Sequence, residues 1–288
     1  MTDPLLSPGE LRALARARLT LRRPAGVLPG GHLARRRGTS LEFADHRPYQ
    51  PGDDFRLIDW AVYARHRRLV TKTFAHEVEA PLYVLLDASR SMAEGRKDLF
   101  SRRLAAALLF VAYRGQDRFA LCPFRDRPAS APNPRRGRVA LAAAFQSLLN
   151  LSPDGETDLS GSLAAWAEAR PEPGLCVVIS DFLSPDGYRN GLRSLCHGRH
   201  AVAAVQVLSR ADLDPPRLGE VRLLDLETHR GKSLILGVGA ARAYREVLRE
   251  WNEGLADACR EMATPYFLFR SEASPVEAAL ELLAGWGR

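Results

Sequence analysis

From residue 81 onward, the chain alternates short apolar runs with longer segments whose apolar positions recur at helical spacing. The short runs predict buried strands, and the longer segments predict helices packed against them. Their alternation predicts an α/β fold with a doubly wound, mainly parallel sheet, and we expect all the strands to complete one layer. The expected strands are 82–86, 118–122, 175–180, 201–208, 221–226, 233–236 and 266–269, and the expected helices are 96–114, 139–149, 159–169, 185–196, 240–262 and 275–284.

The first quarter of the chain has a different pattern. A short helical candidate, 8–21, precedes a connector rich in Gly and Arg, 26–38, and a polar segment with strand-like alternation. This region has too few apolar positions to bury a core easily by itself. With 288 residues in total, we therefore expect an N-terminal extension over 1–76 and one large domain over 77–288.

Positive charge is concentrated in the same first quarter. Residues 1–76 contain 14 Lys and Arg against 7 Asp and Glu, whereas the remainder contains 27 of each, so the whole net charge of +7 lies in the extension. Such a region can attract nucleic acid, an anionic surface or an acidic protein, although a solvated basic face is the simpler interpretation. The arginines concerned are Arg16, Arg18, Arg22, Arg23, Arg35, Arg36, Arg37, Arg65, Arg67 and Arg68.

Cysteine usage and hydropathy predict a cytoplasmic protein. The four cysteines are far apart and show no metal-ligand spacing, as expected of reduced thiols. The longest apolar run, 104–113, is about half of the roughly 20 residues that a membrane helix needs. The N-terminus also lacks the basic and apolar segments of a signal peptide.

Five oxygen-bearing side chains predict a site for a hard metal ion: Asp87, Ser89, Ser91, Thr157 and Asp181. Asp87 and Asp181 each follow an expected strand, and the carboxyl ends of parallel strands face the ligand crevice of such sheets. Two carboxylates and three hydroxyls suit Mg²⁺, although Mn²⁺ or Ca²⁺ would also accept them. An alternative is that Asp87 and Ser89 only cap the following helix and Thr157 caps another.

The pattern Asp-x-Ser-x-Ser, followed by a loop Thr and a loop Asp, resembles the metal-ion-dependent adhesion site of von Willebrand factor A domains. The resemblance implies that Ser89, Ser91 and Thr157 hold Mg²⁺ directly or through water. Asp87 and Asp181 would bind the ion or orient its waters. A metal position left open by the protein would then accept a carboxylate from a partner.

The segment before this pattern resembles the signature of domain-of-unknown-function family 58, in residues 38–43, 47–49, 51–60 and 64–65. The resemblance extends from about residue 35 to the C-terminus. We expect its polar residues, Asp53, Asp54, Arg56 and Asp59, to form an ion-pair network that fixes the extension to the main domain, with Trp60 and Tyr63 packed beneath it. Direct contact with a partner is the alternative.

Family resemblance also implies a function. Members are commonly encoded beside MoxR-type AAA+ ATPases, which implies an adaptor or co-chaperone that binds an acidic side chain of the ATPase or its client. The resemblance implies no catalytic step, so we expect that the protein is not an enzyme. The alternative is a Mg²⁺-dependent hydrolase of phosphoryl or acyl substrates, but the five-residue set has no His or Glu to act as a general base. A hydrolase with Asp87 as an aspartyl-phosphate nucleophile would need a second carboxylate two positions later, where Ser89 stands.

Overall fold

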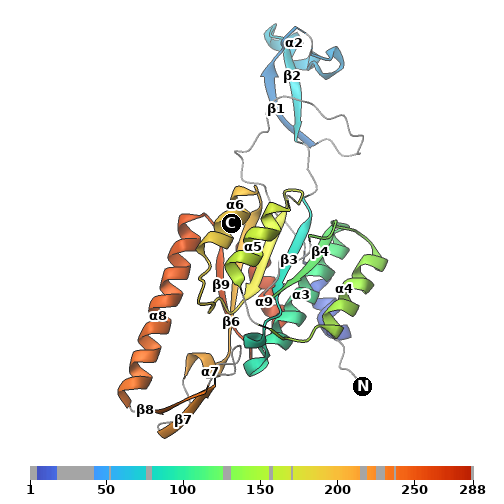
Figure 1. Ribbon diagram of the computed structural model, residues 1–288. Helices are drawn as coiled ribbons and strands as arrows, with labels where there is room; N and C mark the ends of the chain where they lie inside the picture. The colour runs from blue at the N-terminus through green and yellow to red at the C-terminus, as the bar shows by residue number, and fades with distance from the viewer. Residues whose placement is uncertain are drawn as a thin grey trace. The chain divides into compact units, whose positions relative to one another are not determined.

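The chain forms two compact units, which we describe separately. One unit combines Met1–Arg23 with Ala80–Arg288, and the other spans Pro24–Glu79. The structure is a computed structural model, drawn in Figure 1. It describes residues 5–17, 42–51, 53–75, 80–125, 131–155, 158–169, 171–214, 219–224, 231–236 and 238–286.

The larger unit is built on a five-stranded parallel sheet. Its strand order is β4-β3-β5-β6-β9, and every neighbouring pair is parallel (Figure 1). This arrangement confirms the α/β fold with a doubly wound parallel sheet that the apolar runs predict. The strands are β3 (Leu82–Asp87), β4 (Phe119–Phe124), β5 (Leu175–Ser180), β6 (Ala201–Leu208) and β9 (Tyr266–Arg270).

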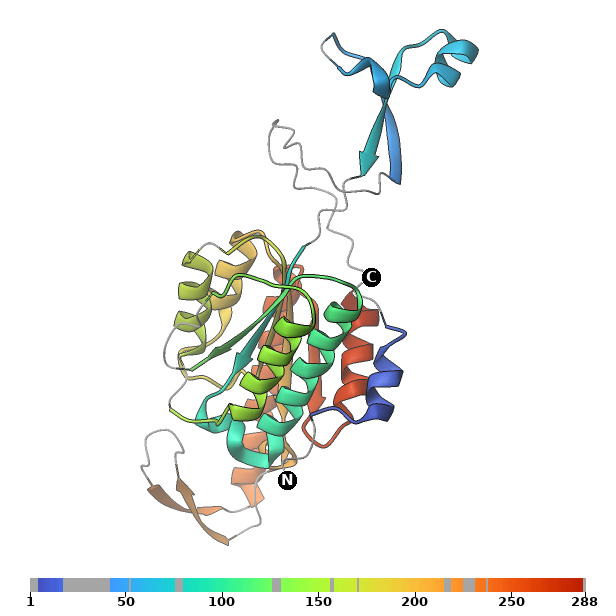
Figure 2. The same ribbon diagram turned by 90° about the vertical axis from the view of Figure 1, so that its right-hand side faces the viewer.

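Helices cover both faces of this sheet, and Figures 1 and 2 show the two layers. Alternation along β3 assigns the faces: Leu82, Val84 and Leu86 belong to one apolar core, and Tyr83 and Leu85 to the other. The first core is covered by α1 (Pro8–Leu14), α3 (Lys97–Arg114), α4 (Arg138–Asn150) and α9 (Pro275–Trp286). The second is covered by α5 (Leu159–Glu168), α6 (Arg189–His197) and α8 (Val238–Glu261). None of the helices within the described ranges is long and apolar enough to cross a membrane.

The strand order places a topological switch between β3 and β5. Numbered along the chain, the five strands lie in the order 2-1-3-4-5, and ligands of such sheets bind where the order reverses, outside the carboxyl ends of the strands. Leu86 is in register with Ile179, so Asp87 and Ser180 end their strands side by side. Two of the predicted metal ligands, Asp87 and Asp181, therefore lie at this switch point.

Two predicted strands do not join the central sheet. β7 (Gly219–Leu224) and β8 (Gly231–Leu236) pair antiparallel with each other in a separate sheet, which corrects the expectation of one continuous layer. Only residues 225–230 connect them, whereas a parallel crossover needs about a dozen residues or more. A hairpin is therefore the pairing that this short link allows.

The smaller unit is an antiparallel pair of strands with a helical insertion. β1 (Glu42–Pro48) pairs with β2 (Val70–Ala75), and a 3₁₀ helix, η1 (Phe55–Leu57), and α2 (Trp60–His66) lie between them in the sequence. Asp54 caps η1 by accepting a hydrogen bond from the Arg56 amide, and Asp59 caps α2 through the amides of Ala61 and Val62. These caps fix the two short helices locally.

Candidate metal centre

Asp87, Ser89 and Ser91 lie where β3 leads into the 3₁₀ helix η2 (Arg90–Arg96): Asp87 ends the strand, Ser89 is the N-cap of η2, and Ser91 lies in its first turn. Asp87 is only 3% exposed, and its Oδ1 accepts a hydrogen bond from the Ser89 amide at 2.9 Å. The buried Ser89 occupies the N-cap position of η2, yet its side chain makes no capping hydrogen bond. Its Oγ lies 3.1 Å from Ser91 Oγ instead. The geometry of Ser89 is thus that of a paired hydroxyl and not of a helix cap.

Ser180 joins this turn to the neighbouring strand. Its Oγ donates a 2.6 Å hydrogen bond to Asp87 Oδ2 and accepts one from the Phe182 amide at 3.0 Å. Phe182 has a φ of 56°, which is uncommon for a residue with a side chain. Ser180 is absent from the predicted set because it ends an apolar run and shares no motif with Asp87.

Asp181 pairs with a buried lysine that the sequence motifs do not include. Lys97 Nζ lies 2.9 Å from Asp181 Oδ2 and 3.1 Å from Asp212 Oδ2, and the lysine side chain is 2% exposed. The Leu183 amide donates to the other Asp181 oxygen at 3.2 Å. A compositional signal marks this residue: Lys97 is one of three lysines, beside Lys72 and Lys232, in a chain where arginine supplies nearly every other positive charge.

Thr157 lies outside the described residues, but the loop just before it reaches the Asp87 turn. The Asp154 amide donates to Ala88 O at 3.0 Å, and the Arg90 amide donates to Gly155 O at 3.1 Å. Arg90 and Asp154 also form an ion pair with an N–O distance of 2.7 Å. The structure therefore brings residues 154–155 beside the turn that holds Asp87, Ser89 and Ser91.

Burial and neighbouring charges shift the pKa values of two groups in the cluster, Asp87 and Lys97. Burial, with a further contribution from Asp181, raises the pKa of Asp87. Burial lowers the pKa of Lys97, but the charges of Asp181 and Asp212 outweigh it and leave that pKa above its ordinary value. Three carboxylates and one ammonium give the cluster of Asp87, Asp181, Asp212 and Lys97 a formal charge of −2.

The oxygen set is compatible with a small divalent cation. In an octahedral Mg²⁺ site with metal–oxygen distances of about 2.1 Å, adjacent ligand oxygens lie about 3.0 Å apart. The 3.1 Å between the Ser89 and Ser91 hydroxyl oxygens matches that spacing. Among the residues with a described position, no three or more His, Cys, Asp or Glu side chains form a metal-binding group. A site here would depend on hydroxyls as well as carboxylates.

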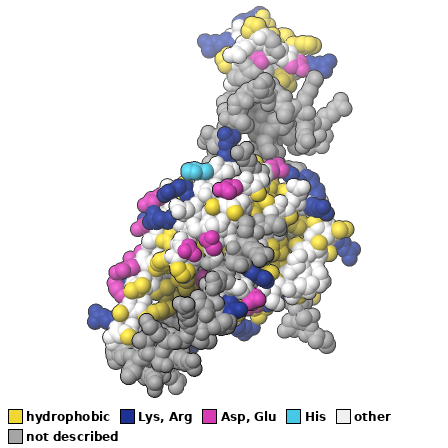
Figure 3. Space-filling view, in the orientation of Figure 1, with side chains coloured by type: hydrophobic (Ala, Val, Ile, Leu, Met, Phe, Trp, Pro, Cys, Tyr) yellow, Lys and Arg dark blue, Asp and Glu magenta, His cyan; other side chains and the backbone are white. Residues whose placement is uncertain are grey.

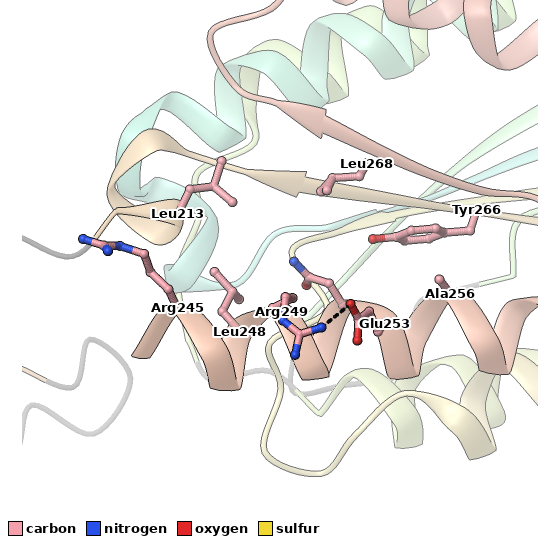
Figure 4. A pocket seen from close by; sticks show the side chains of 9 residues that line it. Leu213, Arg245, Leu248, Arg249, Glu253, Ala256, Tyr266 and Leu268 are labelled. Atoms are coloured by element: carbon pink, nitrogen blue, oxygen red, sulfur yellow. Dashed lines mark hydrogen bonds and ion pairs between the residues drawn. The ribbon is translucent and has the colours of Figure 1, made fainter. Parts of the chain in front are cut away.

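A separate cavity lies beside α8 and has a volume of about 420 Å³. Figure 4 shows Leu213, Leu248 and Leu268 around it. Two further lining residues reach the cluster indirectly: Tyr266 donates to Gln206 Oε1 at 2.5 Å, and Gln206 donates to Asn252 and to the Asp181 carbonyl. The buried Gln206 amide thus connects the wall of the cavity to the backbone of Asp181.

In the smaller unit, the signature residues are divided between caps and exposed side chains. Asp53 accepts from the Gln50 amide at 2.9 Å, and Asp59 lies 2.9 Å from His46 Nε2 besides capping α2. Trp60 is 58% exposed, so it is not packed beneath the acidic residues as expected. Figure 3 shows hydrophobic side chains beside Lys and Arg side chains on this unit.

Several of the arginines predicted to form an anion-binding surface lie outside the described ranges: Arg18, Arg22, Arg23, Arg35, Arg36 and Arg37. Arg65, Arg67 and Arg68 are exposed near the end of α2. Arg56 lies over the Phe55 ring, with 5.9 Å between its guanidinium carbon and the ring centroid. Arg65, Arg67 and Arg68 are therefore accessible on the smaller unit, and Arg16, in the larger unit, is exposed as well.

The fold and the carboxyl-end cluster define an α/β protein with a doubly wound parallel sheet. The family model "Protein of unknown function DUF58" matches residues 45–250, and the chain belongs to this family. A Mycobacterium tuberculosis relative named "Uncharacterized protein Rv1480" is 32% identical over 235 residues, covering 78% of this chain and 72% of the relative. "Uncharacterized protein MAV169" of Mycobacterium avium is 28% identical over 125 residues, covering 42% of this chain and 73% of the relative.

Solved structures with a similar arrangement include two bacterial proteins. The conserved hypothetical protein BatB from Bacteroides thetaiotaomicron aligns with a TM-score of 0.44 and 14% identity, over 71% of this chain and 98% of that one. A von Willebrand factor type A protein from Catenulispora acidiphila aligns with a TM-score of 0.45 and 15% identity, over 75% of this chain and 43% of that one.

Proposed function

We propose that the carboxyl end of the central sheet binds a divalent cation, with Mg²⁺ as the favoured ion. The bound cation would then coordinate an acidic side chain of a partner protein. Asp87, Ser89 and Ser91 would supply ligands from one turn, and Thr157 and Asp181 would complete the set directly or through water. The observation that carries the proposal is a buried cluster of formal charge −2 at the switch point, beside two hydroxyl oxygens that lie 3.1 Å apart.

Charge balance supports a cation at this position. Within the described part of the chain, no cationic side chain forms an ion pair with Asp87, although the carboxylate is nearly fully buried. Burying an unpaired carboxylate is costly, and such groups are usually paired or coordinate a metal. A bound Mg²⁺ would supply the missing positive charge and a Lewis-acidic position for an incoming carboxylate.

The residues favour binding over catalysis. Three of the five expected ligands are neutral hydroxyls, which donate less negative charge to the ion than carboxylates would and leave it electrophilic toward a further anionic ligand. The set contains no His or Glu that would act as a general base. The protein itself is therefore proposed to be an interaction module and not an enzyme.

The resemblance to domain-of-unknown-function family 58 suggests the partner. We infer an adaptor or co-chaperone that works with a MoxR-type AAA+ ATPase in the cytoplasm and binds an Asp or Glu of the ATPase or its client. Nucleotide-driven motion of the ATPase would then be transmitted through the metal-bound contact.

The test is a pull-down of the AAA+ ATPase by the full-length protein, in Mg²⁺ or in EDTA. Wild type should retain the ATPase only in Mg²⁺, and Asp87→Ala should weaken binding by at least about 100-fold. Asp257→Ala removes an exposed carboxylate on α8 and should bind like wild type. Undiminished capture in EDTA would overturn the proposal.

Metal binding can be measured without the partner. Mg²⁺ at 100 times its dissociation constant should stabilise wild type against unfolding by about 2.7 kcal/mol. The same addition should leave Asp87→Ala unchanged while Asp257→Ala responds like wild type. Circular dichroism of each variant would confirm that it is folded before the comparison is made.

A further inference from the structure

Lys97 occupies a position that disfavours a positive charge in two ways. It is the first residue of α3, where the helix dipole places partial positive charge, and its side chain is 2% exposed. A buried ammonium is tolerated only when it is paired and hydrogen-bonded. The surroundings of Lys97 must therefore supply substantial negative charge.

Two carboxylates from separate loops supply that charge. Asp181 follows β5 and lies 2.9 Å from the ammonium, and Asp212, in α7 (Arg210–Leu213), lies 3.1 Å from it. Asp212 is itself held by Ser209, whose amide and hydroxyl donate to Asp212 Oδ2 at 2.7 and 2.8 Å. The ammonium thus lies between a proposed metal ligand and a second, fixed carboxylate.

We propose that Lys97 sets the net charge of the metal site and thereby its selectivity for an anionic ligand, an inference that rests on the proposed function. With Asp87, Asp181 and Asp212, Lys97 gives a formal charge of −2, which a divalent ion neutralises. Without Lys97 the loaded site would retain one negative charge and repel an incoming carboxylate. Without the charge of Asp212 it would retain one positive charge and attract that carboxylate more strongly.

A purely structural ion pair gives a different expectation. A lysine that only connects α3 to the β5 loop needs one carboxylate, whereas two face Lys97 and leave a surplus negative charge. Loss of a purely structural contact would disorder Asp181 and weaken both metal and anion binding. The charge role requires the two affinities to change in opposite directions.

The experiment measures Mn²⁺ and acetate binding to the full-length protein. Mn²⁺ affinity is obtained by isothermal titration, and acetate affinity from the loss of water proton relaxation as acetate displaces water from the bound Mn²⁺. Lys97→Met should tighten Mn²⁺ binding by about tenfold and weaken acetate binding by about tenfold. Asp212→Asn should shift both affinities by similar factors in the reverse directions.

The double variant Lys97→Met with Asp212→Asn is the matched control. It removes the ion pair but keeps the formal charge of −2, so both affinities should return to within about threefold of wild type. It also keeps the test decisive if Lys97→Met alone does not fold. Weaker binding of both ligands by folded Lys97→Met, or by the double variant, would overturn the charge role. No Mn²⁺ binding by wild type would instead overturn the proposed function and this inference together.

Discussion

The two ends of the central sheet both bury polar side chains, but among the residues that the structure describes, only those at the carboxyl end bury formal charge. At the amino end, His200 is 7% exposed and its Nδ1 accepts the Gly174 amide at 3.2 Å. Its ring lies against Trp166 and Tyr83, with ring centroids 5.2 and 5.9 Å apart. At the carboxyl end, Asp87 and its neighbours carry a formal charge of −2. The sheet is thus closed by a neutral cluster at one end and an anionic one at the other.

The pKa shifts at the two ends have opposite consequences for stability. Burial lowers the pKa of His200 to about 4, so protons bind the unfolded chain more readily and acid destabilises the fold. Burial and the charge of Asp181 raise the pKa of Asp87, so the folded state binds a proton more readily than the unfolded chain. At higher pH the ionised Asp87 lowers the stability of the fold, and protonation in acid removes this destabilisation. The anionic end is the one whose stability would benefit from a cation.

Gly95→Ala should cause the largest loss of stability among the substitutions considered for the two ends. Gly95 has a φ of 57°, and a Cβ at this position would lie 2.1 Å from Ser209 Cβ, in the residue that holds Asp212. Backbone strain and the clash together should lower the free energy of unfolding by about 4 kcal/mol, measured by urea denaturation. Gly239→Ala on α8 has open space around it and should change stability by less than about 0.5 kcal/mol. Equal effects of the two substitutions would contradict the close packing at Gly95.

The neutral end should make the protein acid-sensitive through His200. Because its pKa is about 4 in the folded protein and about 6.5 in the unfolded chain, its contribution to stability is complete above pH 6.5 and declines toward pH 4. The loss over this window should be about 3 kcal/mol. In His200→Asn, the Asn Oδ1 can accept the hydrogen bond from the Gly174 amide. This variant should therefore lack the pH-dependent loss of stability when urea unfolding is compared between pH 7 and pH 4.5.

A matched histidine variant tests the assignment. His197 is exposed at the end of α6, so His197→Asn should keep the pH dependence of wild type. If His200→Asn kept it too, the neutral end would not be the origin of the acid sensitivity.

Sequence patterns predict the strands of the central sheet and the carboxylates at their ends, but not the side-chain contacts between them. The apolar runs at 82–86, 175–180 and 201–208 locate β3, β5 and β6, because a buried parallel strand must be apolar on both faces. Asp87 and Asp181 follow from their positions after two of these runs. The β7–β8 hairpin shows the limit, since an apolar run does not reveal which strand it will pair with.

The contacts of Lys97 and Ser180 depend on tertiary structure. Lys97 meets Asp181 and Asp212 across sequence separations of 84 and 115 residues, and Ser180 meets Asp87 across 93. No local periodicity encodes such contacts. The rarity of lysine in this chain was the one available signal for Lys97, and Ser180 had none beyond its place at a strand end.

The smallest expected change in the free energy of unfolding comes from removing one hydroxyl at each end of the sheet. Ser180→Ala removes the donor to the Asp87 carboxylate and leaves the Phe182 amide without its acceptor, so it should cost about 2 kcal/mol in urea unfolding at pH 7. Tyr83→Phe removes a buried hydroxyl that has no hydrogen-bond partner among the described residues, so it should be neutral or slightly stabilising. If Tyr83→Phe cost as much as Ser180→Ala, hydroxyls at the two ends would contribute alike. A cost confined to Ser180→Ala would show that the carboxyl end depends on donors that compensate its buried negative charge.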